Sequence, residues 1–286
     1  MTEKAVLGFP RLTRQATFTG GAWAAGYPVG NLGILPLAQV ARSSSLAPAA
    51  TAFTATFDRE RLVRMLGLVR HNVSIDGKIR IRVFEDAAKT VLLHDTGTVD
   101  MWPEVYPPSA LEWEDDAFWS GRYSSDEIEG YAPTRPFLFD DLYLCRAIEV
   151  SITDPSNPAG YVEIGLFEIA TGWQVGSNYD FGAEYGYRFR SEMVEALGGV
   201  RYFERRDKPR VFSGTINYLR RDEALARGFE MLRRHDIDEP FLWLPNPTEP
   251  LHWLRTCFLA RNVNPGLLAS TFRGRERFPI SLEEVL

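Results

Sequence analysis

Cysteine is scarce in this sequence: there are two in 286 residues, Cys145 and Cys257, far apart in the chain. Each lies in an apolar run, which predicts buried free thiols rather than a disulfide. The four histidines show no His-x-x-x-His spacing, and there is no Cys-x-x-Cys pair, so no zinc site is expected. Asp140, Asp141 and Asp154 could offer oxygen ligands to calcium, but no Asp-x-Asp-x-Asp-Gly loop surrounds them. We therefore expect no metal and no cofactor.

The sequence patterns of common enzyme classes are missing too. There is no Gly-x-Ser-x-Gly elbow and no Gly-x-x-x-x-Gly-Lys-Ser/Thr phosphate loop. The acidic run at 112–116 could place two carboxylates for glycoside hydrolysis, although a solvated acidic loop is the simpler explanation. Because no nucleophile, base and orienting group can be combined, we expect a protein that is not an enzyme.

Long apolar runs are absent. No stretch approaches the roughly 18 apolar residues of a transmembrane helix, and the N-terminal residues lack the apolar core of a signal peptide. The net charge of −6 gives no reason to expect sequence-specific binding to nucleic acid. These features favour a globular protein made in the cytoplasm, without a membrane span.

What the sequence does contain is strand pattern. Residues 79–84 alternate apolar side chains with arginine, directly after an Asp76-Gly77 turn. Residues 51–58 alternate as well, and 142–153 and 161–170 form two further strands around a proline-rich loop. Many short strands without a long helix predict an N-terminal β-sandwich. A change in composition near 173–180 suggests two domains, 1–175 and 176–286.

The second domain shows a mixed pattern. Strands are expected at 200–206, 211–219, 240–245 and 254–261, with a Lys208-Pro209 turn after the first. A helix is expected between the second and third, with Asp222 at its start, where a carboxylate suits the helix dipole. Leu225, Phe229 and Leu232, with Ala224, Gly228 and Met231 beside them, give the helix one apolar face, which is expected to pack on a sheet. The fold class is therefore mainly β: a jelly-roll sandwich followed by a smaller α+β domain with one helix on a sheet.

Several of these stretches resemble known families. The sandwich resembles galactose-binding-like jelly rolls, in the version found in tail proteins of long-tailed bacteriophages, and the second domain is similar to the tube-like domain of phage distal tail and minor tail proteins. The resemblance is carried by 68–74, 78–84, 147–150 and 160–167 in the first domain, and by 203–207, 221–224 and 240–247 in the second. In the better-known distal tail proteins the two domains occur in the opposite order.

This resemblance implies a structural virion protein of the tail tip, located in the virion tail. It implies a homo-oligomeric ring, a hexamer rather than a trimer, that joins the tail tube to hub or fibre components. The alternative is a carbohydrate-binding module of a protein that recognises glycans on the host surface.

Two sets of residues are candidates for contacts. The first is the main basic density of the chain, which could face an acidic partner ring, line a lumen that passes DNA, or be a solvated pair of strands. The second is aromatic and could stack on sugars, form a subunit interface, or simply pack in the protein. The basic set is Arg201, Arg205, Arg206, Lys208, Arg210 and Arg220, and the aromatic set is Trp102, Tyr106, Trp113 and Trp119.

Overall fold

The structure is a computed structural model that describes residues 3–107, 109, 112–114, 118–264 and 266–286. It divides into two compact units. Unit 1 comprises residues 1–174 and 242–257, and unit 2 comprises residues 175–241 and 258–286. The segment 242–257, which the sequence analysis placed in the second domain, thus belongs to unit 1.

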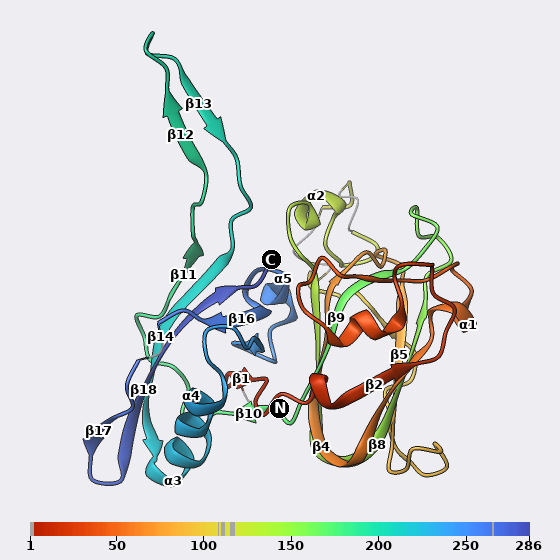
Figure 1. Ribbon diagram of the computed structural model, residues 1–286, viewed down its shortest axis with the longest axis horizontal. Coiled ribbons are helices and arrows are strands. Elements are labelled where there is room, and N and C mark those ends of the chain that lie inside the picture. The colour runs from red at the N-terminus through yellow and green to blue at the C-terminus, as the bar shows by residue number, and fades with distance from the viewer. Residues whose placement is uncertain (1–2, 108, 110–111, 115–117, 265) are drawn as a thin grey trace. The chain divides into compact units, whose positions relative to one another are not determined.

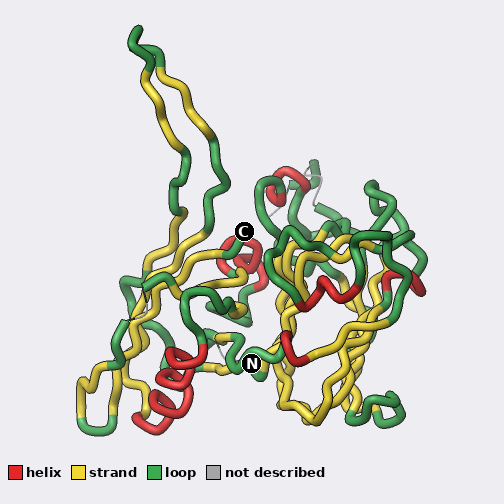
Figure 2. The backbone as a smooth tube through the Cα atoms, viewed as in Figure 1, coloured by secondary structure: helices red, strands yellow, loops and turns green. Residues whose placement is uncertain are grey.

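Unit 1 is mainly β, with short helical turns between its strands (Figures 1 and 2). Its helical turns are η1 (Thr13–Gln15), η2 (Val29–Gly33), α1 (Pro48–Thr51), α2 (Ser125–Ile128), η5 (Pro250–His252) and α5 (Trp253–Thr256). Its strands are β1 (Val6–Leu7), β2 (Ala16–Thr19), β3 (Ala41–Arg42), β4 (Phe53–His71), β5 (Lys78–Phe84), β6 (Leu92–Asp95), β7 (Val99–Asp100), β8 (Thr134–Thr153), β9 (Glu163–Ala170), β10 (Trp173–Gln174) and β15 (Phe241–Leu244).

The two long strands β4 and β8 run through both layers of a sandwich. The first half of β4 pairs with the second half of β8, as in Phe53↔Val150, and this layer continues through β2 on one side and β5 and β6 on the other. Beyond two register shifts, the second half of β4 pairs with the first half of β8 and with β9, which pairs with β3. Figure 1 shows the two strands bending together. The predicted β-sandwich is therefore confirmed.

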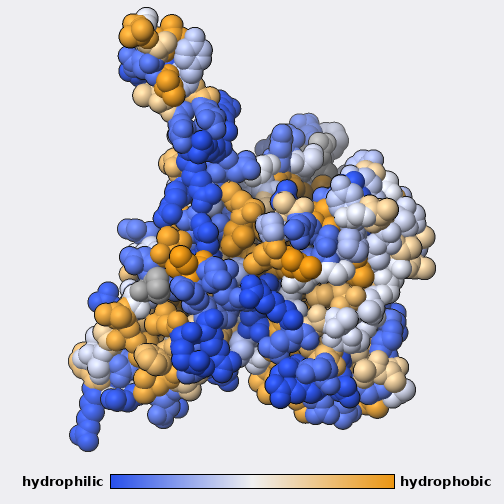
Figure 3. Space-filling model, viewed as in Figure 1, coloured by the Kyte–Doolittle hydropathy of each residue, from blue (hydrophilic) through white to orange (hydrophobic). Residues whose placement is uncertain are grey.

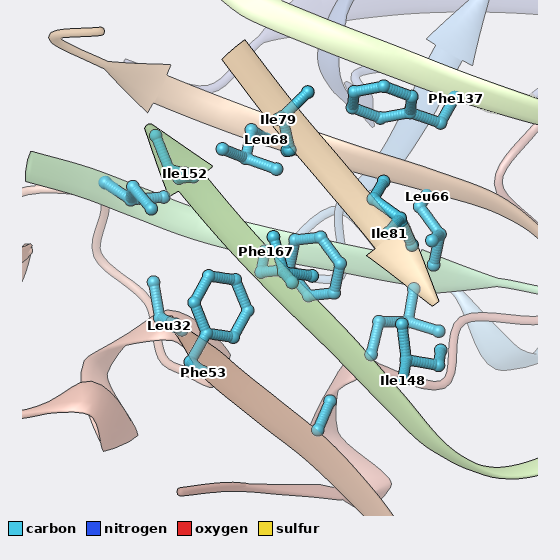
Figure 4. Packing of buried hydrophobic residues seen from close by; sticks show 14 of the residues in the cluster. Leu32, Phe53, Leu66, Leu68, Ile79, Ile81, Phe137, Ile148, Ile152 and Phe167 are labelled. Carbon is cyan, nitrogen blue, oxygen red and sulfur yellow. The ribbon is translucent and has the colours of Figure 1, made fainter. Parts of the chain in front are cut away.

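The sandwich core is built from side chains of both layers (Figure 4). Ile79, Ile81 and Val83 of β5 are fully buried and alternate with arginines that face outward, as the sequence pattern predicts. Phe53 of β4 and Phe167 of β9 meet edge to face, with ring centroids 5.2 Å apart. Full burial of one such side chain contributes about 1.5–3 kcal/mol, so this core is the main source of stability in unit 1.

The segment 242–257 belongs to unit 1 because its apolar residues fill a second cluster there. Val6 of β1 pairs with Leu244 of β15, and both pack with Met65 and Cys257. Gly8 allows this close approach: a side chain there would place Cβ 2.8 Å from the Leu242 backbone nitrogen. Cys257 and Cys145 are both buried free thiols, as predicted, and burial raises the pKa of Cys145 to about 12.

Unit 2 is a smaller sheet with one helical segment. Its central strands lie in the order β16-β18-β14-β11, and β17 pairs with β18. β12 pairs only with β13 among the described strands. The strands are β11 (Glu184–Tyr187), β12 (Glu192–Glu195), β13 (Arg201–Glu204), β14 (Arg210–Arg220), β16 (Phe258–Asn262), β17 (Ala269–Phe272) and β18 (Arg275–Glu284).

The Lys208-Pro209 turn does not pair the strands on either side of it. β13 pairs with β12 and then continues as extended chain into β14, which pairs with β11 and β18. The expected strand at 254–261 is also shorter than predicted, because it begins with helix α5 and becomes β16 only at Phe258.

The predicted helix forms, but only part of its predicted apolar face is buried. It runs through α3 (Arg221–Glu223), a π-helical stretch η4 (Ala224–Phe229) and α4 (Glu230–Arg234), and packs against β18. Ala224, Gly228 and Met231 are buried, whereas Leu225 and Phe229 are 43% and 54% exposed. The small Ala224 and Gly228 let the helix backbone approach the sheet closely.

Asp222 lies in the first turn of this segment, as predicted, although the residue in the N-cap position is Arg220. No helix among the described residues is both long and apolar enough to cross a membrane.

A buried ion pair joins the neighbouring strands β14 and β18 of unit 2. The Arg210 guanidinium donates to the Glu284 carboxylate, with Nε 2.8 Å from Oε2, and the two side chains are 4% and 5% exposed. The Arg210 guanidinium also lies over the Phe258 ring, 5.2 Å from its centroid. Because both charges are desolvated, loss of either partner would leave a buried unpaired charge and lower the stability of unit 2.

We expect Arg210→Met to destabilise unit 2 by about 3–5 kcal/mol, because Glu284 would keep a buried charge without a partner. All seven tryptophans lie in unit 1, so tryptophan emission does not report on this change. Hydrogen exchange of β14 and β18 amides is the suitable measurement. Arg233→Met is the matched control, since it removes an exposed ion pair with Glu230 and should change exchange little. Equal exchange in the two variants would contradict the prediction.

Candidate functional site

The most exposed element of unit 2 is a projecting hairpin, residues 188–209, which we call the arm. It continues the β11–β14 pair into the β12–β13 pair, with Glu192 opposite Glu204 and Glu195 opposite Arg201. A tight turn closes it, with Gly199 at φ +78° and the Ala196 N–H donating to the Val200 carbonyl. At about 3.3 Å per residue, the ribbon extends about 30 Å from the end of β11. Figures 1 and 2 show it projecting as two strands without a third.

The arm carries large apolar side chains on both of its faces. Met193 and Phe203 are opposite one another on one face, and Val194 and Tyr202 are opposite one another on the other. Tyr202 and Phe203 are 63% and 65% exposed, and hydrophobic surface marks the tip in Figure 3. The exposed apolar residues of the arm are Phe189, Met193, Val194, Leu197, Val200, Tyr202 and Phe203.

Charged side chains hold the ribbon in register. Arg206 forms ion pairs with both Glu192 and Glu204, at 3.0 and 3.1 Å, and so offsets the repulsion between these opposed carboxylates. Arg201 pairs with Glu195 directly across the strands, at 3.1 Å.

The base of the arm is attached to the sheet by one buried carboxylate. Glu283 of β18 has no exposed side-chain surface and pairs with Arg188 and Arg190 of the arm and with Arg261 of β16. Three guanidinium groups around one carboxylate leave a net positive charge at the base. These arginines are half exposed, so this charge is available to an acidic partner surface.

The six basic candidates differ in their exposure and in their contacts. Arg201 and Arg206 are exposed but paired within the arm, and the Lys208 ammonium lies 5.2 Å from the centroid of the Phe189 ring. Arg205 and Arg220 are also exposed. Arg210 requires a correction: it is buried against Glu284, so it can neither contact a partner ring nor line a lumen.

The four aromatic candidates also differ in how far they are buried. Trp102 is 7% exposed, and its indole N–H donates to the Val73 carbonyl at 3.0 Å, so it is a packing residue and cannot stack on a sugar. Tyr106 is half buried, donates to Glu127, and contacts the ring of Tyr123. Trp113 and Trp119 are 74% and 88% exposed and remain candidates for contact. Of the acidic run, Asp115 and Asp116 lie outside the described residues.

Unit 1 has a groove of about 470 Å³ formed by loops at one end of the sandwich. Asp154 holds two of these loops together, because its carboxylate accepts from the Ser74 N–H and from the Asn157 amide, both at 2.8 Å. This role replaces the calcium ligation considered for Asp154. The groove is lined by His71, Asn72, Val73, Ser74, Ile75, Asp76, Trp102, Ser125, Ile128, Pro133, Ser156 and Pro158. Its mix of hydroxyl groups and apolar side chains suits a neutral polar ligand.

His71 lies at the floor of the groove, 7% exposed, with its ring against the edge of Trp102. Burial, and then the positive charge of Arg135, lowers the pKa of His71 from 6.5 to about 3. The imidazole is therefore neutral in the folded protein over the physiological range of pH. Sequence analysis could not identify this role of His71, because a single histidine in an apolar strand has no diagnostic spacing.

The two units thus define a mainly β protein, in which a sandwich carries a groove and a smaller α+β unit carries a projecting apolar arm. No family model matches the chain, and no curated protein matches it.

Several solved structures are similar in fold to part of this chain. SpGH29 is 12% identical with a TM-score of 0.38, over 57% of this chain and only 28% of that one. The family 32 carbohydrate-binding module of C. perfringens NanJ, solved with galactose, is 12% identical with a TM-score of 0.37, over 58% of this chain and 98% of that one. The lectin domain of Lectinolysin, complexed with Lewis B antigen, is 10% identical with a TM-score of 0.35, over 56% and 96%.

We expect His71→Gln to change how the stability of unit 1 depends on pH. In the wild-type protein the unfolded chain binds a proton at His71 below about pH 6.5 and the folded chain does so only near pH 3, so stability falls as pH decreases across this window. Removing the imidazole should make this fall shallower by up to about 1.4 kcal/mol per pH unit. Tryptophan emission during urea unfolding at each pH measures it. The control is His252→Gln, an exposed histidine of the same unit. An unchanged slope for His71→Gln would disprove the assignment.

Proposed function

We propose that this chain is a structural protein of a bacteriophage tail tip, which assembles as a symmetric ring between the tail tube and the hub or fibre components. The observation that carries the proposal is the arm. A two-stranded ribbon is marginally stable in water by itself, and this one exposes apolar side chains on both faces. Such a ribbon is expected to gain its stability from a neighbouring molecule.

The arm has the chemistry of an interface anchor. Tyrosine and phenylalanine supply large apolar area with few rotatable bonds, which limits the entropy lost on contact. Its two outer strand edges have no partner strand among the described residues, so they can add to the sheet of a neighbour. β11 is a further edge strand of unit 2, with Tyr185 and Tyr187 half exposed. These features support association through sheet edges rather than through a pocket.

The charges of the arm would set the register of such a contact. Its middle carries paired arginines and glutamates, and its base carries the surplus positive charge around Glu283. Charge complementarity contributes more to register and partner choice than to affinity. The resemblance to phage tail proteins implies a hexameric ring. A ring of identical chains would place each arm against the same surface of its neighbour.

We expect the double variant Tyr202→Ser, Phe203→Ser to lose assembly while both units stay folded, because it removes one anchor from each face of the arm. Mass photometry measures the assembly state, alone and with tail-tube and hub proteins, and tryptophan emission and circular dichroism report folding. The control is Leu142→Ser, Leu144→Ser, which removes two exposed leucines from β8 of unit 1. The proposal fails if the wild-type chain stays monomeric with every tail partner, or if both double variants assemble equally.

A second candidate function is glycan binding by unit 1, and the groove beside α2 favours it. Its volume of about 470 Å³ matches the usual size of a small-ligand site, and its lining combines hydroxyl groups with apolar side chains. Trp119 is almost fully exposed and has the flat apolar face that packs on a sugar ring.

If unit 1 binds glycans, Ser156→Tyr should weaken binding about tenfold by narrowing the groove, a loss of about 1.4 kcal/mol. Trp119→Ala tests the stacking surface separately. A glycan array followed by calorimetry on the ligands found provides the measurement, with Tyr187→Ala in unit 2 as the control for loss of an exposed aromatic ring. A blank array with the wild-type chain would exclude this function for the glycans tested.

A further inference from the structure

The end of unit 2 opposite the arm carries an exposed basic surface, which we call the patch. Strand β14 runs from the base of the arm to this end, a distance of about 33 Å at about 3.3 Å per residue. There β14 and β17 pair with the two sides of β18. Figure 1 shows the arm and the β17–β18 turn at opposite ends of the unit. The patch comprises Tyr218, Arg220, Phe272, Arg273, Arg275 and Arg277, all of them exposed.

Strand register places arginines of the patch on one face of the sheet. Arg220 of β14 lies directly opposite Arg275 of β18, and Arg277 follows two residues further along the same face. Like charges in directly opposed positions repel each other. Glu276 points to the other face and is 5% exposed, so it does not lie between the two guanidinium groups. No described residue forms an ion pair with Arg220, Arg273 or Arg277, so the patch keeps a surplus of positive charge.

Two aromatic rings lie beside these arginines. Tyr218 and Phe272 stack on each other, with centroids 5.9 Å apart and 19° between the rings, and are 53% and 61% exposed. Tyr218 has φ +61°, a left-handed conformation that is uncommon for an aromatic residue, at the register shift in β14. Arg275 donates from Nη1 to the Tyr218 carbonyl at 3.0 Å and supports this conformation. The patch therefore combines exposed apolar area with positive charge.

The outer part of the arm has the opposite sign of charge. Residues 191–204 contain three glutamates and one arginine. The inner part of the arm, residues 188–190 and 205–209, contains five basic residues and one aspartate. The arm is therefore polarised along its length, and a surface that matches its outer part must be positive.

One face of the arm combines this negative charge with apolar area. Glu192 and Val194 of β12 lie opposite Glu204 and Tyr202 of β13, and the period of two places all four on one face. Arg206 pairs with both glutamates, but each carboxylate can accept further hydrogen bonds.

We infer that the patch is the surface on which a second copy of this chain receives the arm, through the face that carries Glu192 and Glu204. This inference rests on the ring proposed above and names the surface that each arm contacts. The two carboxylates pair with arginines of the patch, and Tyr202 packs against the stacked aromatic rings. The opposite face of the arm, with Phe203, stays available to a further neighbour.

The position of the two surfaces requires a second copy. A chain cannot place its arm on its own patch, because the arm extends away from β14 at the end opposite the patch (Figure 1). Since the two surfaces differ, the contact is heterologous, and an open assembly always leaves one arm and one patch free until a ring closes. A single-stranded nucleic acid also suits arginines beside aromatic rings. The second copy is favoured because this chain itself supplies a face with the complementary charge and apolar area.

The test uses two variants of the full chain that each disable one surface. The arm variant is Tyr202→Ser, Phe203→Ser, and the patch variant is Arg220→Glu, Arg277→Glu. Arg220→Glu places a carboxylate opposite Arg275, so unit 2 should fold at least as well as in the wild-type chain. Each variant alone should raise the concentration needed for assembly by at least about tenfold.

An equal mixture of the two variants gives the sharper result. The arm of the patch variant can still enter the patch of the arm variant, so the mixture should form a dimer with one copy of each and no ring. Sedimentation velocity at high protein concentration measures the assembly state, with tail-tube and hub proteins added in parallel. Hydrogen exchange of β14 amides reports folding of unit 2.

The control is Arg233→Glu, Arg234→Glu, which makes the same change of charge on exposed residues of α4 and should assemble like the wild-type chain. A wild-type chain that stays monomeric with every tail partner sinks both the ring and this inference. If the wild-type chain assembles and the patch variant assembles equally well, the ring proposal stands and this inference is overturned. A mixture that stays monomeric overturns it too. Unchanged assembly of the patch variant, with loss of affinity for an oligothymidine strand, would assign the patch to nucleic acid instead.

Discussion

The pairing of β4 with β8 is the constraint on which unit 1 depends. Each strand is long enough to enter both layers of the sandwich, so the ribbon that they form fixes the two layers together. β2, β5 and β9 all pair with one of these two strands, and the loops that follow β4 and β8 form part of the groove. At the bend, Asp58–Glu60 and Asp140–Leu142 are exposed, because there the ribbon runs outside the core.

The same bend explains where sequence analysis succeeded and where it failed in unit 1. The alternation at Ile79, Ile81 and Val83 was recognised because one face of β5 is buried and the other is solvated. Strands β4 and β8 were predicted as shorter pieces because polar residues at the bend interrupt the apolar pattern. The contact of Arg135 with Trp253 could not be predicted, since it forms only after folding brings together residues far apart in sequence.

In unit 2 the sequence misled for a different physical reason. Period-two patterns arise when one face of a strand is buried, and the arm has no buried face. Adjacent apolar residues such as Met193-Val194 and Tyr202-Phe203 therefore showed no alternation, and β12 was missed, although Gly198-Gly199 is a turn signal. The helix and its apolar face were predicted, but the pattern did not show which part of that face contacts the sheet. Ala224, Gly228 and Met231 are buried, and Leu225 and Phe229 are exposed.

An arm with apolar residues on both faces limits how a partner can bind it. A flat partner surface would cover one face and leave the other in water, so it would recover only half of the available apolar area. A partner that receives the arm in a cleft, or two partners that hold it between them, would bury both Phe203 and Tyr202. Insertion between neighbouring chains satisfies this requirement, and a closed ring satisfies it for every copy at once.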